Sequence, residues 1–233
     1  MVNLSKSRTK MIQKIFSYLI PIKIFKKKSV RSKTIEVTWS NGELVLDSEN
    51  TNYSYGSLQR ILRYGLRNIG YSSILKMDHI LLLGVAGGSV VKTLIDEIQY
   101  KGKITGVEID SEMIQIANEY FNLDQIKQLE IIIEDAFEFV LKTKYKYDLI
   151  IVDIFEDVKM PNFLFESFFS DRICSLLKNQ GFVLFNTMIL DEAHNVRNRK
   201  YVNEINSRLF ATKMLPRIED HNELIIIEKL SKI

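Results

Sequence analysis

Three acidic residues lie at the carboxyl ends of short apolar runs of this sequence. Glu108 ends the run 104–107, Asp135 follows the run 129–133, and Asp153 ends the run 147–152. We expect each run to be a buried strand of a parallel sheet, whose strand carboxyl ends form the edge at which such sheets bind ligands. Right-handed crossover connections bring these ends to one edge. The sequence therefore predicts a ligand site that contains three carboxylates.

A glycine-rich turn, GVAGGS at 84–89, lies ahead of the first of these acids. The apolar run 80–83 precedes it, and apolar residues then recur at helical spacing at 90, 91, 94, 95 and 98. This order is a βαβ unit with the layout of a nucleotide site. The glycines allow a sharp turn and a close approach of ligand to backbone, and the helix start offers free N–H groups. Glu108 is then placed to accept hydrogen bonds from ribose hydroxyls.

The turn departs from the dinucleotide fingerprint, which needs glycine at 84, 86 and 89. The chain has Gly84, Ala86 and Ser89 there. A nucleoside ligand without a pyrophosphate, such as S-adenosylmethionine, is therefore favoured over NAD. A turn that only packs its helix on the strand stays open as the alternative.

Composition suits one α/β domain with a small extension, because the chain has 233 residues of which 46% are hydrophobic. The single cysteine, Cys174, excludes an internal disulfide and fits a reducing cytoplasm. It falls in an apolar helical pattern, so we expect a buried, inert thiol. No apolar run approaches the roughly 18 residues of a membrane span. We assign no metal site.

Charge is distributed unevenly. Residues 1–33 contain ten Lys or Arg and no acid, which leaves 22 basic and 29 acidic residues and a net charge of −7 for the remainder. An acidic body argues against a nucleic-acid partner. Segment 1–20 predicts a short basic amphipathic helix that ends before Pro21. Three roles stay open for it: packing on its own domain or a second subunit, contact with an anionic membrane surface, or a loose tail.

Two further regions complete the expected organisation. Segment 21–56 predicts a small antiparallel hairpin region, since 35–39 alternates and Asn41-Gly42 is a strong type I′ turn. A polar linker at 47–56 contains Tyr53 and Tyr55, which either line a pocket mouth or simply pack. Segment 57–233 predicts a Rossmann-like domain, a mostly parallel seven-stranded sheet with helices on both faces. Within it Ser111 is expected to cap a helix, residues 179–181 to form a turn before a strand at 182–185, and two last strands to lie near 211–217 and 223–229.

In its motifs the chain resembles the spermidine synthase-like branch of the class I S-adenosylmethionine-dependent methyltransferase superfamily. The matching pieces occur in family order between about 41 and 186. They are NGELVLDS (41–48), ILLLGVAGGSVVKTL (80–94), ITGVEIDSEMIQIANEYF (104–121), IIIEDAFEFV (131–140), YDLIIVDIFEDVKMP (147–161) and LLKNQGFVLFN (176–186).

The resemblance implies a role for each matching position. Gly84, Ala86 and Gly87 would cradle the amino-acid end of the cofactor, Glu108 would bind ribose, and Ile109 would pack on adenine. Asp135, beside Ala136, would hydrogen-bond the adenine amino group. Asp153 would face the reacting centre and take part in deprotonating an attacking amine, which is inert while protonated. The loop 153–161, which contains Glu156 and Asp157, is a candidate for the acceptor pocket together with Tyr53 and Tyr55. A homodimer is compatible with the branch.

Three departures from polyamine synthases stand out. Their glycine turn carries an Asp that contacts the aminopropyl amine, and Gly87 occupies that position here. Their DSSDP-like loop is replaced by residues 153–157, DIFED, and the expected Gln after the LDG motif has no equivalent. We therefore expect an S-adenosylmethionine-dependent transferase, with methyl transfer to a small acceptor. The alternatives are a polyamine aminopropyltransferase that uses decarboxylated S-adenosylmethionine, and a non-catalytic binding protein on the same fold.

Overall fold

The computed structural model describes residues 2–29, 33–47, 52–156, 159–219 and 221–231, with backbone only for 2–8, 33, 52 and 53. Seven strands form one sheet in the order β10-β11-β9-β8-β5-β6-β7. Five of them, from β9 to β7, are parallel, and β11 is antiparallel to both neighbours. The strands are β5 (His79–Leu83), β6 (Lys103–Glu108), β7 (Leu129–Ile133), β8 (Tyr147–Val152), β9 (Leu177–Met188), β10 (Phe210–Ile218) and β11 (Asn222–Lys229). The predicted Rossmann-like α/β fold is confirmed.

Helices cover both faces of this sheet because its strands are apolar on both sides. Ile80 and Leu82 of β5 join one buried core, and Leu81 and Leu83 join the other. The first core contains side chains of α2 (Gly56–Ile69), α3 (Tyr71–Ile74), α4 (Ser89–Lys92) and α5 (Ser111–Phe121). The second contains side chains of α6 (Ala136–Lys142), α7 (Ser167–Ser175) and α8 (Glu192–Glu204). Cys174 is buried in the second core, and burial raises the pKa of its thiol to about 12, as an inert thiol requires.

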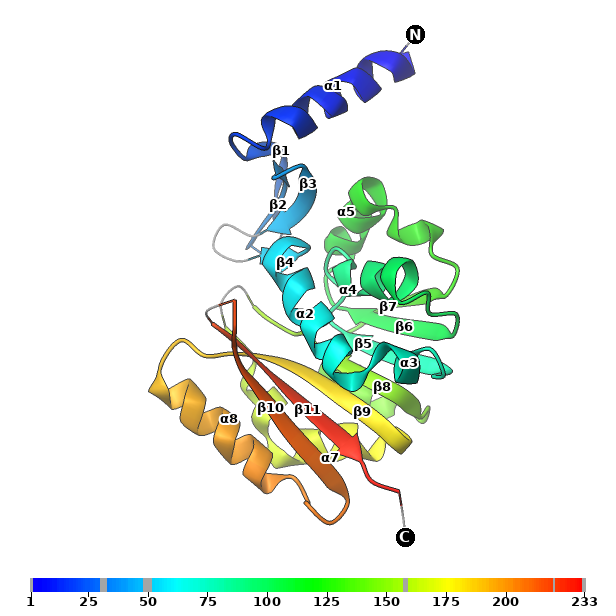
Figure 1. Ribbon diagram of the computed structural model, residues 1–233, viewed down its shortest axis with the longest axis vertical. Coiled ribbons are helices and arrows are strands. Elements are labelled where there is room, and N and C mark those ends of the chain that lie inside the picture. Colours follow the sequence, from blue (N-terminus) through cyan, green and yellow to red (C-terminus); the bar gives the residue numbers. More distant parts are fainter. Residues whose placement is uncertain (1, 30–32, 48–51, 157–158, 220, 232–233) are drawn as a thin grey trace.

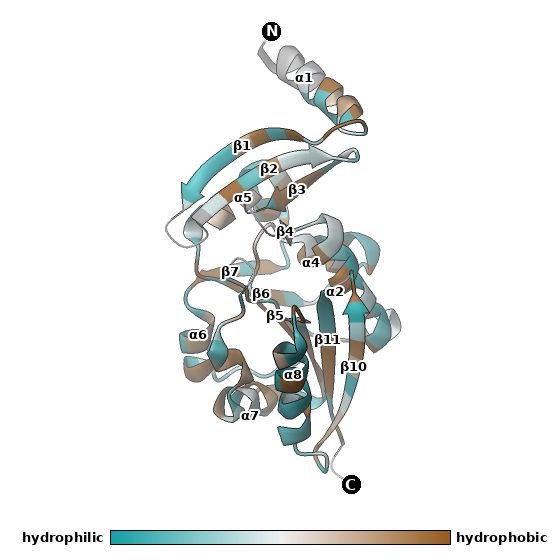
Figure 2. Ribbon diagram, turned by 90° about the vertical axis from the view of Figure 1, so that its left-hand side faces the viewer, coloured by the Kyte–Doolittle hydropathy of each residue, from teal (hydrophilic) through white to brown (hydrophobic). Residues whose placement is uncertain are grey.

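A separate four-stranded antiparallel sheet lies ahead of this domain (Figures 1 and 2). It contains β1 (Ile22–Ser29), β2 (Lys33–Ser40), β3 (Glu43–Asp47) and β4 (Asn52–Ser54). Asn41 and Gly42 both have positive φ, 50° and 79°, which confirms the predicted type I′ turn between β2 and β3. The predicted polar linker is wrong in part, because β4 pairs with β3 within it. The sheet packs on α5 through Val37 and Leu46.

The basic amphipathic segment forms α1 (Val2–Phe16), which projects from the small sheet away from the large one (Figure 1). Among the described residues, no helix is long and apolar enough to cross a membrane.

Two predicted details are wrong. The N-cap of α5 is Asp110, not Ser111, because Oδ1 of Asp110 accepts hydrogen bonds from the backbone N–H groups of Glu112 and Met113. Both residue types are good caps, and apolar periodicity does not fix a boundary to one residue. The turn at 179–181 is an irregularity inside β9, where Gln180 has a φ of 60° and the pairing with β8 shifts register.

Candidate functional site

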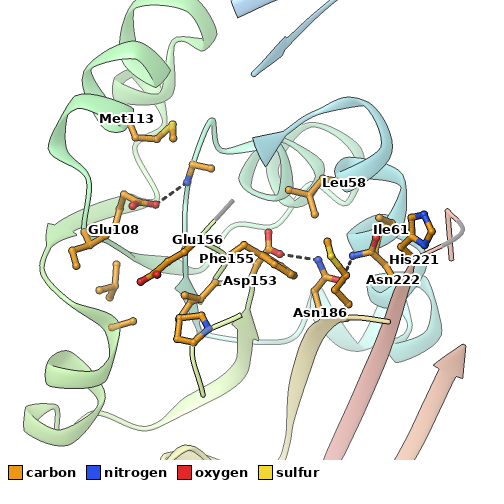
Figure 3. Close-up of a pocket in the computed structure, with 18 of the residues that line it drawn as sticks. Leu58, Ile61, Glu108, Met113, Asp153, Phe155, Glu156, Asn186, His221 and Asn222 are labelled. Carbon is orange, nitrogen blue, oxygen red and sulfur yellow. Dashed lines mark hydrogen bonds between the residues drawn. The ribbon is translucent and has the colours of Figure 1, made fainter. Parts of the chain in front are cut away.

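A pocket of about 370 Å³ opens at the carboxyl edge of the large sheet. Figure 3 shows Glu108 at one end, the Asn222 and His221 side chains at the other, and Asp153 between them. The parallel strands β5, β6, β7 and β8 deliver their terminal residues to this edge, as the parallel topology requires. The structure brings together most of the predicted site residues, namely Gly84, Ala86, Glu108, Ile109, Asp135, Ala136, Asp153 and Glu156.

Glu108 ties the glycine turn to the end of β6. Its Oε2 accepts hydrogen bonds from the backbone N–H groups of Val85 and Ala86, each at 3.0 Å, and its Oε1 accepts one from Asp110 N at 3.0 Å. Burial raises the pKa of Glu108, and these three bonds act against that increase. A carboxylate has about four acceptor positions, so one position on Oε1 remains for a ligand hydroxyl.

The glycine turn needs its glycine at position 84. Gly84 has a φ of 86°, and a Cβ there would lie 2.1 Å from the backbone oxygen of Asp153. The missing side chain thus lets the ends of β5 and β8 approach each other beside the pocket. Ala86, two residues further on and with a φ of 46°, also lines the pocket.

Gly87 does not line the pocket, although the resemblance assigned it to the cofactor. A Cβ at this position would lie 2.8 Å from the Cβ of Ser54 in β4. Ser54 also accepts a hydrogen bond through Oγ from the backbone N–H of Ser89, at 3.0 Å. Position 87 is therefore covered by the small N-terminal sheet, and an acidic side chain there would require β4 to move.

One carboxylate oxygen of Asp135 caps a helix, and the other is available to a ligand in the pocket. Its Oδ1 caps α6 by accepting hydrogen bonds from the N–H groups of Phe137 and Glu138, at 2.8 and 3.4 Å. Its Oδ2 receives no hydrogen bond from the part of the chain that the structure describes. Ile109, which is 37% exposed, and Ala136 line the pocket with it. An apolar surface beside one available carboxylate oxygen suits the face and the amino group of a purine.

Asp153 is held from one side by an amide chain. Nδ2 of Asn186 donates to its Oδ1 at 2.8 Å, and Nδ2 of Asn222 donates to Oδ1 of Asn186 at 2.9 Å (Figure 3). Burial raises the pKa of Asp153 to about 7, to which the negative charge of Glu108 contributes, while the Asn186 hydrogen bond acts in the opposite direction. Asp153 is thus poised to exchange a proton near neutral pH.

Sequence reasoning missed much of the acceptor end of the pocket. Asn186 directly follows the strand predicted at 182–185 but was given no role, and Asn222 starts β11, which is distant in sequence. The remaining missed lining residues come from α2, α5, β6, β9 and the loops beside them; they are Ser57, Leu58, Ile61, Val107, Met113, Phe163, Met188, Leu190, Glu219 and His221. Ile154, Phe155 and Pro161 also line the pocket, and they fall in the loop 153–161 that was predicted to contribute to it. The paired amides carried a usable signal, since each lies at the pocket end of its strand.

Of the three other residues predicted for the acceptor pocket, Tyr55 alone has a described side chain, and it does not line the pocket. Tyr55 stacks on Phe121, with ring centroids 4.4 Å apart, and packs in the core beneath the small sheet. This corrects the pocket prediction for Tyr55 in favour of packing, because α5 offers it an apolar surface. Tyr53 lies in β4 but its side chain is outside the described residues, as is all of Asp157.

The charge of the pocket is strongly one-sided. Five carboxylates line it, from Glu108, Asp135, Asp153, Glu156 and Glu219. No lysine or arginine is among the described residues that line it. Arg60, outside the lining, pairs with Glu219 through two contacts of 2.6 and 2.9 Å. The four other carboxylates favour a positively charged ligand, such as a sulfonium or an ammonium.

Comparisons with known proteins identify the family and the fold of the chain. The family model described as spermine/spermidine synthase domain matches residues 63–213. A polyamine aminopropyltransferase of Saccharolobus solfataricus is 28% identical over 168 residues, covering 60% of this chain and 56% of the relative. An eEF1A lysine and N-terminal methyltransferase homolog of Drosophila melanogaster is 24% identical, covering 63% of this chain and 22% of the relative. The chain thus spans about half, or less, of the length of these curated relatives.

Two solved structures share the fold. A spermidine synthase in complex with the transition-state analogue AdoDATO superposes with a TM-score of 0.67 and 17% identity, covering 89% of this chain and 74% of that one. Human methyltransferase-like protein 13 in complex with SAH gives a TM-score of 0.61 and 21% identity, covering 76% and 83%. At these identities the likeness concerns the fold.

Proposed function

Because this chain belongs to the spermine/spermidine synthase family, we propose that it transfers an alkyl group from an adenosyl-sulfonium compound to a small amine. The observation that carries the proposal is the pocket itself. At the carboxyl edge of the sheet, several carboxylates surround Asp153, whose pKa is raised. The described residues that line the pocket include no lysine or arginine. Both the donor and the protonated acceptor of such a reaction are cations, which these carboxylates would attract.

Decarboxylated S-adenosylmethionine is the donor that the relatives favour, with aminopropyl transfer as the reaction. The family model and the Saccharolobus relative both carry polyamine-synthase names. Methyl transfer from S-adenosylmethionine is the second candidate. It is favoured by Gly87, where the resemblance leads us to expect an acid against the aminopropyl amine and where Ser54 leaves no room for one, and by the eEF1A methyltransferase relatives.

Residues at one end of the pocket are proposed to bind the nucleoside part of the donor. Glu108, through its remaining acceptor position, and Asp135, through Oδ2, would bind the nucleoside, with Ile109 against the purine. When bound, the adenosyl-sulfonium supplies an electrophilic carbon next to a good thioether leaving group. The site orients the amine toward that carbon and so reduces the entropic part of the barrier.

Asp153 is the proposed catalytic base. An ammonium has no lone pair with which to attack, so a carboxylate must hold it and accept its proton. With a pKa of about 7, Asp153 is a stronger base than an ordinary aspartate and is still substantially ionised at neutral pH. The Asn186–Asn222 chain fixes Oδ1 and leaves Oδ2 toward the pocket, which orients the base.

Calorimetric titration followed by product analysis tests this proposal. The purified protein is titrated with S-adenosylmethionine, its decarboxylated form, 5′-methylthioadenosine and NAD, and is then incubated with each donor and a set of amines beginning with putrescine. Release of 5′-methylthioadenosine from the decarboxylated donor supports aminopropyl transfer. Release of S-adenosylhomocysteine from S-adenosylmethionine supports methyl transfer. Binding of neither donor would overturn the proposal in favour of a non-catalytic protein on this fold.

A further inference from the structure

Helix α1 presents an apolar stripe to solvent. At 100° per residue, Met11, Ile12, Ile15, Phe16 and Leu19 fall on one side of the helix and of the turn that follows it. Ile15 is 61% exposed, Phe16 53% and Leu19 79%. These side chains therefore have little cover from the described part of the chain. Large apolar side chains gathered in this way mark an interaction surface.

The opposite side of the same helix is positively charged. Lys10 and Lys14 lie there, both exposed, and neither forms an ion pair with any described residue. Three of the four lysines of β1 differ: Lys23 and Lys26 pair with Glu36, and Lys27 pairs with Glu112 at 2.9 Å. Lys28 of β1 is also exposed and forms no ion pair with a described residue. The positive charge of α1 is therefore not neutralised, whereas most of the charge of β1 is.

The end of α1 is fixed to the small sheet. The backbone N–H of Asn41 donates to the Ser17 carbonyl at 3.0 Å, and the N–H of Gly42 donates to Ser17 Oγ at 2.9 Å. Tyr18 lies so close to this hairpin turn that a Cβ on Gly42 would be 2.2 Å from its hydroxyl. The end of the helix is therefore attached to the turn, and the helix lies at the end of the molecule away from the large sheet (Figures 1 and 2).

We propose that α1 docks this protein on an anionic lipid surface. A helix with an apolar stripe, flanked by lysines and lacking acids, lies in the plane of such a surface with the stripe among the acyl chains and the lysines at the headgroups. Its 15 residues span about 22 Å, suited to lying on a bilayer rather than crossing it. Two copies of α1 packed stripe to stripe would cover the apolar side chains but leave the lysines without opposite charges, because residues 1–33 contain no acid.

The charge of the rest of the molecule is consistent with this arrangement. Residues 34–233 have a net charge of −7, so the body is repelled by an anionic surface. Because α1 projects from one end of the molecule, it can contact the lipid surface while the rest of the protein, including the pocket, stays in water. The inference is independent of the proposed transferase activity, and its test uses no substrate.

Co-sedimentation of the full chain with vesicles tests the proposal. Vesicles of phosphatidylcholine alone are compared with vesicles in which about one lipid in three is phosphatidylglycerol, near the physiological range of anionic content. We expect binding to the mixed vesicles, much weaker binding to phosphatidylcholine alone, and a decrease with added salt. Equal binding to both vesicle types, or binding to neither, would overturn the proposal.

Charge variants separate the lysines of α1 from general charge. Each lysine near an anionic surface contributes about a fivefold increase in partitioning, so Lys10→Gln with Lys14→Gln should weaken binding about thirtyfold. The matched control is Lys101→Gln with Lys144→Gln, two exposed lysines of the body, which should change binding less than about twofold. Equal losses in the two pairs would contradict a specific role for α1.

Variants of apolar residues distinguish the contribution of the α1 stripe to vesicle binding from that of other exposed apolar side chains. Phe16→Ser with Leu19→Ser should reduce partitioning at least about tenfold, because both side chains would leave the acyl region. The control is Phe168→Ser with Leu75→Ser, two side chains that are 61% and 51% exposed on the body. Light scattering without vesicles completes the test. A dimer that dissociates on Phe16→Ser with Leu19→Ser would show that a second copy covers the stripe and would overturn the proposal.

Discussion

Replacing Asp153 by Asn should make the stability of this protein less dependent on pH. The substitution keeps the size of the side chain and an oxygen for the Asn186 hydrogen bond, but removes the ionisation. The folded-state pKa of Asp153 is about 7 and its ordinary value is 3.8, because the buried carboxylate is harder to ionise than in the unfolded chain. A raised folded pKa stabilises the wild type fully below the unfolded value, and this contribution is lost as pH rises through the folded value.

The size of the effect follows from the two pKa values. The difference between 3.8 and about 7 corresponds to about 4 kcal/mol of unfolding free energy over the whole range. Between pH 5 and 8 it corresponds to about 2.6 kcal/mol. One side of Asp153 faces the pocket, where water reaches it, so we expect a change of about 1 to 2 kcal/mol in that window. The stability of the variant relative to the wild type should therefore increase as the pH rises to about 7.

Urea unfolding of both proteins at pH 5, 6, 7 and 8 measures this difference without knowledge of the substrate. For a chain of this length, the expected change corresponds to a few degrees in the melting temperature. Asp124→Asn, the same substitution at an exposed side chain, controls for general loss of a carboxylate. The free energy of unfolding of the variant minus that of the wild type should increase from pH 5 to 8. A difference that stays constant or decreases over this range would refute the assignment of Asp153 as a base with a raised pKa.

Three further predictions test the rest of the site. Glu108→Ala removes the acceptor of three backbone hydrogen bonds, so it should lower stability by about 1 to 3 kcal/mol in urea and also abolish donor binding in calorimetry; unchanged donor affinity would contradict the ribose contact. Gly84→Ala should lower the free energy of unfolding by more than about 2 kcal/mol, because it combines a positive φ with a 2.1 Å contact to the Asp153 carbonyl oxygen. The control is Gly70→Ala, whose Cβ meets only Ser73 Oγ at 3.7 Å and which should show the cost of the positive φ alone. Equal losses of stability in the two variants would contradict the close approach of Gly84 to Asp153. Asn186→Ala should raise the pKa of Asp153 above about 7, since it deletes the hydrogen bond that lowers it; carboxyl carbon NMR would reveal an unchanged value if that bond has no electrostatic role.

Local sequence signals predicted the framework of the site well. The acids at the ends of three apolar runs do meet at one sheet edge, because parallel topology and right-handed crossovers leave no other arrangement. The type I′ turn at Asn41-Gly42 was also predictable, since both residues tolerate positive φ. These inferences depend on periodicity and turn chemistry, which act over a few residues.

Contacts between distant segments were beyond this reasoning. The amide chain from Asn222 to Asn186 joins two antiparallel strands, and its effect on Asp153 depends on a register that no local pattern fixes. For Tyr55 the sequence left both a pocket mouth and packing open, with packing favoured, and the structure shows Phe121 of α5 stacked against it. Gly87 looked like a cofactor contact until β4 covered it with Ser54.

The sequence by itself therefore determined the βαβ framework, the acidic edge and the basic amphipathic character of α1. Only the tertiary structure decided which acid is buried enough to act as a base, which glycine faces the pocket, and that the stripe of α1 is left exposed. The physical reason is that burial and desolvation depend on all elements that surround a group. The pKa of Asp153 and the exposure of Phe16 are both set by such neighbours.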